Sequence, residues 1–264
     1  MQKGKTIFSV LIDITMIKRG FLLLLLGLVL GLSSKAQKEH IIEIDDDIQL
    51  IHLQDSIFLH VTWEHVGSWY FSSNGLIIVK EGEALMIDTP MDNDKTERLT
   101  KFLRDSFSVN LTQLIIGHFH NDCLGGLDYL QSIGVESIAN SRTVEKCKEI
   151  GLPIPSIAFR DSLTFDFNGE QIDCRFFGAG HSFDNITVWI PDKKILFGGC
   201  LVKSSDSQDL GNLSDAVVAD WDLTINKLLS KYIGIQTVIP GHGDYGGVEL
   251  LTHTIELVEK EKSK

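Results

Sequence analysis

GHFHNDCLGG, residues 117–126, directly follows the apolar, strand-like run Leu114–Ile116. In an extended segment alternate side chains point the same way, so His118, His120 and Asp122 are predicted to converge just past the end of a strand. Imidazole and carboxylate groups bind zinc, and the two glycines that close the stretch let the backbone turn tightly beneath them. The stretch therefore indicates a metal site at the edge of a sheet, with an exposed polar loop as the alternative.

Three later segments supply further candidate ligands. His181 lies in GAGHSFDN (178–185), Cys200 ends LFGGC (196–200), and His242 lies in PGHG (240–243). Each comes after a predicted strand and near glycine, which is where open α/β sheets display their sites. Taken singly, the two histidines read as turn residues and Cys200 as a buried thiol. Taken with the first stretch, they complete six ligands, enough for two metal ions.

The chain as a whole predicts an α/β fold with a single domain over residues 37–264. The opening meander consists of four strand-like runs, Ile41–Ile44, Ile57–Trp63, Gly75–Val79 and Ala84–Ile87. Helices, a second meander and further helices follow, and no low-complexity linker divides them. This order predicts two sheets packed face to face with helices outside.

Residues 1–36 are predicted to be a signal peptide that is removed from the mature protein. Lys18-Arg19 precedes the apolar run Phe21–Leu32, and Ser34 and Ala36 supply the small residues of a cleavage site. A run of this length is too short to span a bilayer, which takes about 20 apolar residues. We therefore expect export to the periplasm without a stable membrane anchor, and an uncleaved anchor is the alternative.

Charge narrows the choice of partner. The 264-residue chain carries 24 basic and 36 acidic residues, a net charge of −12. Without residues 1–36 it keeps 19 basic and 35 acidic residues over 228 positions, a net charge of −16. Such a surface does not attract nucleic acid or anionic lipid.

Met16 is an alternative start, because residues 1–15 add nothing to a signal peptide.

Cysteine usage points in the same direction as the metal pattern. Four cysteines in an exported protein favour disulfides by default. A domain of this size buries most of its apolar surface without such staples, however. A chemical role for at least one thiol is therefore the more informative hypothesis.

Together with their flanking segments, the six candidate ligands resemble those of the class B metallo-β-lactamases. Within that class they resemble the first subclass, whose second zinc is held by Asp, Cys and His. The resemblance covers nearly all of the mature chain, and its segments are SNG (73–75), IDTP (87–90), HFHND (118–122), GHSFDN (180–185), VWIPDKKILFGGC (188–200), GNLSDA (211–216) and PGHG (240–243). It implies a four-layer αβ/βα sandwich with a di-zinc site at the sheet edge.

The resemblance also implies a role for each matching residue. The first zinc would be bound by His118, His120 and His181, and the second by Asp122, Cys200 and His242. Lys203 would bind the substrate carboxylate, Asn212 would lie near the lactam carbonyl, and Asp88 would orient metal ligands. Lys203 also reads as a solvated surface residue, and Asn212 as a turn residue beside Gly211.

The implied reaction is zinc-dependent hydrolysis of the β-lactam amide by metal-bound hydroxide, which confers antibiotic resistance. Asp122 would be catalytic by orienting the attacking water as well as binding metal. The implied partner is a β-lactam small molecule, and the implied assembly is a monomer. The segment Thr62–Phe71 is expected to form a mobile flap over the site.

Several positions depart from the family pattern and keep other functions open. Cys123 follows the metal Asp where relatives carry Arg or another polar residue, so it is a passive buried thiol or a rival ligand. Ser182 replaces the usual Thr, and Met91 an often-seen Trp. A lactonase or thioesterase of the same fold typically has His at position 123 and Asp at 200. A secreted zinc-binding protein without activity is the other alternative.

Overall fold

The computed structural model describes residues 40–264, so the expected signal segment 1–36 lies outside the described residues. These residues form two sheets. The first contains β1 (His40–Asp45), β2 (Ile48–Gln54), β3 (Ile57–Val66), β4 (Trp69–Lys80), β5 (Glu83–Ile87), β6 (Asn110–Ile116), β7 (Glu136–Asn140) and β8 (Ile157–Phe159). The second contains β9 (Ser162–Phe167), β10 (Glu170–Arg175), β11 (Thr187–Ile190), β12 (Ile195–Gly199) and β13 (Thr237–Pro240).

The helices connect the strands or follow the last one. They are α2 (Asn93–Phe107), α3 (Asn121–Leu124), α4 (Leu127–Ser132), α5 (Ser141–Ile150), α6 (Val218–Lys231) and α7 (Glu249–Lys262). Asp92 caps α2 by accepting a hydrogen bond from the Lys95 amide at 2.8 Å, and Ser108 ends the helix in the left-handed region. Within residues 40–264, no helix is long and apolar enough to cross a membrane.

Each sheet combines antiparallel and parallel pairs. In the first sheet β1 to β5 form an antiparallel meander, and β6, β7 and β8 then add in parallel after crossovers through helices. In the second sheet β9 to β12 are antiparallel, and β13 pairs with β12 in parallel after α6. The carboxyl ends of β12 and β13 therefore meet at one edge of that sheet.

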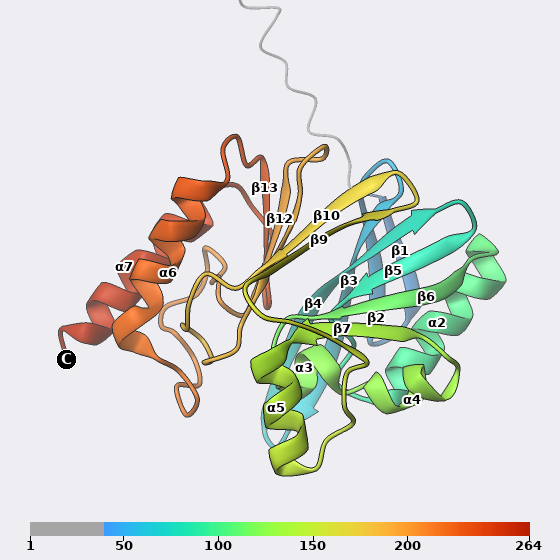
Figure 1. The fold of residues 1–264 in the computed structure, drawn as a ribbon, viewed down its shortest axis with the longest axis horizontal. Coiled ribbons are helices and arrows are strands. Elements are labelled where there is room, and N and C mark those ends of the chain that lie inside the picture. The colour runs from blue at the N-terminus through green and yellow to red at the C-terminus, as the bar shows by residue number, and fades with distance from the viewer. Residues whose placement is uncertain (1–39) are drawn as a thin grey trace, which may run out of the picture. The chain divides into compact units, whose positions relative to one another are not determined.

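Three apolar clusters show that the fold has four layers. One lies between the first sheet and helices α2, α4 and α5, with Leu99 and Leu130 among its members. A second lies between the two sheets and includes Ile87 and Phe197. A third joins the second sheet to α6 and α7 and includes Trp221. Figure 1 shows α6 and α7 outside one sheet and α2, α4 and α5 outside the other. The expected αβ/βα sandwich is confirmed.

Two details of the predicted fold were wrong. Strands β2 and β8 were not expected, because β2 mixes polar with apolar residues and β8 is only three residues long. Thr62–Phe71, predicted as a flap between strands, lies almost wholly within β3 and β4. The ten paired positions of this hairpin run out to Val66 and Trp69, so only Gly67 and Ser68 form a turn.

Candidate metal centre

All six predicted ligands lie near the carboxyl ends of strands. His118 and His120 occupy the turn after β6, and Asp122 lies in α3 directly beyond it. The other three come from the second sheet, with His181 between β10 and β11, Cys200 after β12 and His242 after β13. Three ligands therefore come from each sheet, and the site lies where both sheets end.

Three imidazoles meet at one point. His118 Nε2 lies 2.8 Å from His120 Nδ1, and His181 Nε2 lies 3.3 Å from the same His120 atom. The His118 ring is edge-on to both others, with centroids 4.5 and 4.8 Å away. Three ring nitrogens that face one another cannot all be satisfied by the protons available between neutral imidazoles, whereas one cation would satisfy them together.

The other three ligands form a second cluster beside the first. Cys200 Sγ lies 3.1 Å from Asp122 Oδ2 and 3.4 Å from His242 Nε2, and these two atoms are 3.2 Å apart. Asp122 Oδ1 lies 3.8 Å from His118 Nε2 of the first cluster. The Asp122 carboxylate thus lies between the two clusters.

This donor set fits zinc. Imidazole nitrogen, thiolate sulfur and carboxylate oxygen are its ordinary ligands, and soft thiolate disfavours magnesium or calcium. The six residues also form three overlapping metal-capable groups, whose ligand atoms lie within 4.8 Å of one another: His118 with His181 and Cys200, His118 with His120 and Asp122, and Asp122 with Cys200 and His242.

The local backbone brings His118, His120 and Asp122 together by a different route from the one expected. The extended segment stops at Ile116, and the chain then bends and enters α3 at Asn121. Asp122 therefore converges with the histidines through the first turn of a short helix, not through strand alternation. Gly125 permits the return of the chain, since a Cβ there would lie 2.1 Å from the Met91 carbonyl oxygen.

Three of the six candidate ligands are held in the deprotonated form that a metal ion needs. Hydrogen bonding from Cys123, joined by the nearby His242, holds the pKa of the Cys200 thiol below its usual range. Burial alone would raise the pKa of the Asp122 carboxyl, but the hydrogen bond from His242 and the charge of His118 hold it well below that range. Burial lowers the pKa of His181 and favours its neutral form. Metal ligands need these deprotonated forms.

Each imidazole but one is oriented through its other nitrogen. His242 Nδ1 lies 2.7 Å from the Ser72 carbonyl oxygen, and His118 Nδ1 lies 3.0 Å from Cys123 Sγ. His120 Nε2 lies 3.1 Å from Asp215 Oδ2. Such partners fix the tautomer and direct the remaining nitrogen at the metal. His181 Nδ1 has no hydrogen-bond partner among residues 40–264.

Asp215 is a candidate functional residue that the sequence patterns did not indicate. It belongs to GNLSDA, where only Asn212 was singled out. Its contact with His120 spans 95 positions of sequence, so no local pattern indicates it. A carboxylate close to a metal-binding histidine is the signal that only the fold supplies.

Cys123 lies behind the metal centre. Its side chain is buried and belongs to the core cluster of the first sheet. Its sulfur faces the nitrogen of His118 that points away from the ligand cluster, and it belongs to none of the metal-capable groups formed by the described part of the chain. Burial raises the pKa of this thiol well above its usual value, which favours the uncharged form.

Asp88 supports the same turn from the first sheet. Its carboxylate accepts a hydrogen bond from the Gly117 amide at 2.5 Å. Gly117 is required here, because a Cβ would lie 2.8 Å from Asp88 Oδ2. Asp88 itself adopts the left-handed region with φ 58°, a conformation that costs free energy for a non-glycine residue. Asp88 therefore supports the backbone directly before His118.

Asn74 connects the sheets at the site. Its backbone N–H donates to the Gly241 carbonyl oxygen at 2.9 Å. Its side-chain Nδ2 donates to the carbonyl oxygens of Pro240 and Gly243 at 2.9 and 2.7 Å. These three bonds enclose His242. The segment SNG entered the sequence analysis only as part of the family resemblance. The three hydrogen bonds give a physical reason for an asparagine at position 74.

Lys203 and Asn212, the two residues predicted to contact substrate, have different surroundings. Lys203 is partly buried, and its Nζ lies 5.4 Å from the centre of the Trp221 ring. Burial lowers the pKa of this lysine, while Cys200 and Asp122 act in the opposite direction. Asn212 is exposed, and its Oδ1 accepts a hydrogen bond from the Ser214 amide at 3.0 Å. Its observed contact is thus that of a turn residue.

The hairpin of β3 and β4 carries exposed aromatic side chains at its tip. Trp69 is 76% and Tyr70 57% exposed, and Tyr70 packs against the His65 ring at 4.5 Å. Phe71 points the other way and meets the His242 ring edge-on at 5.6 Å. Phe71 therefore supports a candidate ligand, whereas Trp69 and Tyr70 are exposed at the tip of the hairpin.

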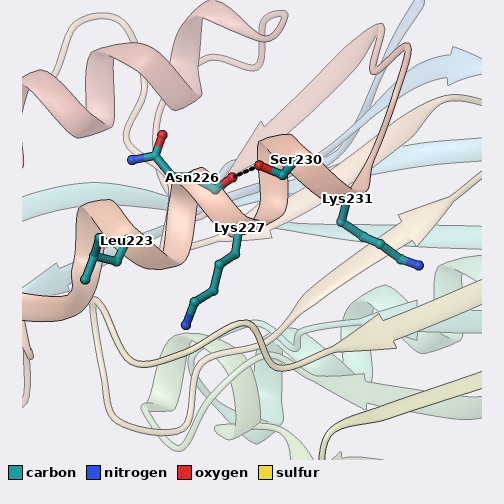
Figure 2. A pocket seen from close by; sticks show the side chains of 5 residues that line it. All are labelled: Leu223, Asn226, Lys227, Ser230 and Lys231. Atoms are coloured by element: carbon teal, nitrogen blue, oxygen red, sulfur yellow. Dashed lines mark hydrogen bonds between the residues drawn. The ribbon is translucent and has the colours of Figure 1, made fainter.

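A separate pocket lies on α6. Figure 2 shows its five lining residues, Leu223, Asn226, Lys227, Ser230 and Lys231, and the hydrogen bond from Ser230 to the Asn226 carbonyl. Its volume is about 530 Å³. None of the six candidate ligands lines it, and it offers no carboxylate, imidazole or thiol for chemistry. The metal centre is the better functional site.

Comparisons with known proteins agree with the geometry. The description "Metallo-beta-lactamase superfamily" belongs to the family whose sequence model matches residues 69–242. A Bacteroides fragilis protein named metallo-beta-lactamase type 2 is 40% identical over 238 residues, 90% of this chain and 95% of the relative. A Bacillus cereus protein of the same name is 32% identical over 93% of this chain and 99% of the relative. The solved structure of TMB-1 is similar with a TM-score of 0.78 and 33% identity, over 83% of this chain and 100% of that one.

Proposed function

This chain belongs to the metallo-β-lactamase superfamily, and we propose that its two ligand clusters hold two zinc ions. The protein is a zinc-dependent β-lactam hydrolase. The observation that carries the proposal is the approach of three imidazole nitrogens to one point beside a separate Asp-Cys-His cluster. His118, His120 and His181 would hold the first ion, and Asp122, Cys200 and His242 the second.

The chain's own residues then have distinct roles. Zinc, when bound, supplies Lewis acidity that activates water and polarises the lactam carbonyl. Asp122 lies between the clusters, so its carboxylate can accept a hydrogen bond from the attacking water and fix its direction. Asp215 holds the His120 ring in place through Nε2. We assign Asp122 the catalytic role and Asp215 a positioning role.

Lys203 is proposed to bind the substrate carboxylate as a point charge. Among residues 40–264, no acidic side chain forms an ion pair with Lys203, so its ammonium group is available. It lies close enough to Cys200 and Asp122 for their charges to affect its pKa. Asn212 is proposed to lie near the lactam carbonyl, and its Oδ1 accepts a hydrogen bond from the Ser214 amide within the turn.

Lys203→Ala should raise KM for a β-lactam about tenfold and change kcat less, since the ammonium contributes uniform binding. Steady-state kinetics with a chromogenic cephalosporin measures both constants. Lys194→Ala, which changes an exposed lysine in the turn before β12, is the control. An unchanged KM in Lys203→Ala would show that Lys203 is a solvated surface residue that does not bind the substrate.

Zinc content and turnover together test the two-ion proposal. Elemental analysis of the dialysed protein should give two zinc ions per chain, and a chelator should abolish opening of the lactam ring. One ion per chain with full activity would contradict the proposal. Intact zinc without turnover of any penicillin, cephalosporin or carbapenem would favour a zinc-binding protein without activity.

We further propose that the protein acts in the periplasm as a monomer and confers β-lactam resistance there. The basic pair Lys18-Arg19, the apolar run Phe21–Leu32 and the small residues before Gln37 support export. N-terminal sequencing of protein from a periplasmic extract should begin at Gln37. Retention of residues 1–36 would contradict cleavage, and light scattering would measure the assembly.

A further inference from the structure

We propose that Trp221 is a positioning residue that holds Lys203 ready for the substrate carboxylate. Trp221 lies in α6, outside every metal-capable group, and it matches none of the motifs singled out in the sequence. This inference rests on the proposed role of Lys203 and deepens it.

The first observation is the contact between the two side chains. Lys203 Nζ lies 5.4 Å from the Trp221 ring centre, inside the range of about 6 Å over which the face of an indole attracts an ammonium group. The Lys203 amide is separately fixed by a hydrogen bond to Thr254 Oγ1 at 2.9 Å. A flexible four-carbon side chain is thus restrained at its base and at its charged end.

The second observation is that Trp221 itself is held in place by its surroundings. Its side chain is fully buried, and its Nε1 donates to the Leu201 carbonyl oxygen at 2.8 Å. Leu201 directly follows Cys200, so the indole is tied to the loop that carries a candidate ligand. A buried indole with its single donor satisfied is a rigid support.

The third observation places this support beside the metal centre. The Trp221 and His181 rings meet edge-on with centroids 6.0 Å apart. Gly180 allows this approach, because a Cβ there would lie 3.0 Å from Trp221 Cδ1. One indole therefore fixes the distance between the Lys203 ammonium and a histidine of the first cluster. A substrate that spans carboxylate and lactam carbonyl depends on that distance.

The test compares Trp221→Leu, which removes the aromatic face, with Trp221→Phe, which keeps a face but loses the hydrogen bond. Trp221→Leu should raise KM for a cephalosporin with a free carboxylate about fivefold, because an unrestrained lysine pays rotamer entropy on binding. Trp221→Phe should raise it about twofold. The kcat and the zinc content should change little in both variants.

The matched control is Trp189→Leu. Trp189 is also a buried tryptophan against the same cluster, but it stacks on Tyr232 at 5.1 Å. It should lose stability with no selective rise in KM. The methyl ester of the same cephalosporin is the second control, since without a carboxylate the rise in KM for Trp221→Leu should vanish. A loss of packing alone would affect acid and ester equally, and that result would overturn the proposal.

A double-mutant cycle with Lys203→Ala completes the experiment. If Trp221 acts through Lys203, adding Trp221→Leu to Lys203→Ala should raise KM no further. An equal rise in both backgrounds would overturn the inference. A raised KM in Lys203→Ala with no change in Trp221→Leu would overturn the role of Trp221 alone. An unchanged KM in Lys203→Ala would remove the proposed anchor and the role of Trp221 with it.

Discussion

Among single residues, the side chains around the candidate metal centre are of two kinds: those placed to bind metal and those placed to orient the ligands. Cys200 and Cys123 are both buried thiols near the same histidines, yet only the sulfur of Cys200 faces Asp122 and His242. Cys123 instead faces the outer nitrogen of His118. Residue type alone does not distinguish the two, whereas position around the site does.

The Cys200→Ser variant should lose most of its second zinc, because a hydroxyl is a poor substitute for thiolate at zinc. Cys147→Ser is the control, since Cys147 is buried in the core behind the first sheet and lies in no metal-capable group. Zinc per chain after dialysis measures the difference. Equal loss of zinc in both variants would mean that the thiol ligand is misassigned.

Asp215→Asn tests whether a carboxylate positions His120. The amide accepts a weaker hydrogen bond from Nε2–H, so the ring is less firmly held and a less basic ligand. We expect zinc affinity to fall about tenfold, because Asp215 is partly solvent-exposed. Competition with a fluorescent zinc chelator measures it. Asp206→Asn, on the exposed loop after Cys200, should leave affinity unchanged, and equal losses in both would contradict the role.

At the scale of elements, the ends of the strands and the close packing between neighbouring strands shape the site. His60 of β3 lies under the end of β5, with Nε2 3.0 Å from the Asp88 carbonyl oxygen. Gly75 of β4 leaves room for the ring, since a Cβ there would lie 2.1 Å from His60 Nε2. This packing holds the β5 turn from which Asp88 supports Gly117.

The buried His60 should make folding sensitive to acid. Burial lowers its pKa from 6.5 to about 4, so between these values the unfolded chain binds a proton that the folded protein does not. Its stabilisation is fully present above pH 6.5 and is lost as the pH falls toward 4, by about 3 kcal/mol in total.

Urea unfolding of the zinc-loaded protein from pH 7 to pH 4 measures this dependence. The His60→Gln variant should lose free energy of unfolding less steeply than the unsubstituted protein over this range. His40→Gln, an exposed change in β1, should keep the full slope. Identical slopes for all three proteins would show that His60 does not titrate as its burial requires.

For the whole molecule, the two sheets meet at the metal centre. His118, His120 and Asp122 come from the first sheet and the other three ligands from the second, and Asn74 bridges the same edge. At the opposite ends of the strands, Lys80 of β4 pairs with the buried Glu170 of β10 at 3.0 Å. The sandwich is therefore closed by polar contacts at both ends of its apolar interior.

Removal of zinc should lower Tm, because an ion held by ligands from both sheets would bind the folded chain in preference to the unfolded one. At about 100 times Kd, one ion stabilises by about 2.7 kcal/mol. For a chain of this size that corresponds to a fall of roughly 5–10 °C on chelation. Calorimetry with and without chelator, followed by added zinc, measures it. An unchanged Tm would show that the metal does not hold the sheets together.

The sequence by itself determined the α/β class, the paired meanders and all six candidate ligands, because strand ends, glycines and ligand types lie close together along the chain. It did not determine the orientation of the ligands. The contacts of Asp215 with His120, of Asn74 with Pro240 and of Trp221 with Lys203 span 95, 166 and 18 positions of sequence. The short helix α3 lies where the sequence predicted an extended segment. These depend on which distant segments pack together, and periodicity carries no information about that. The tertiary structure decided them because hydrogen-bond and ring contacts are set by the folding of both sheets.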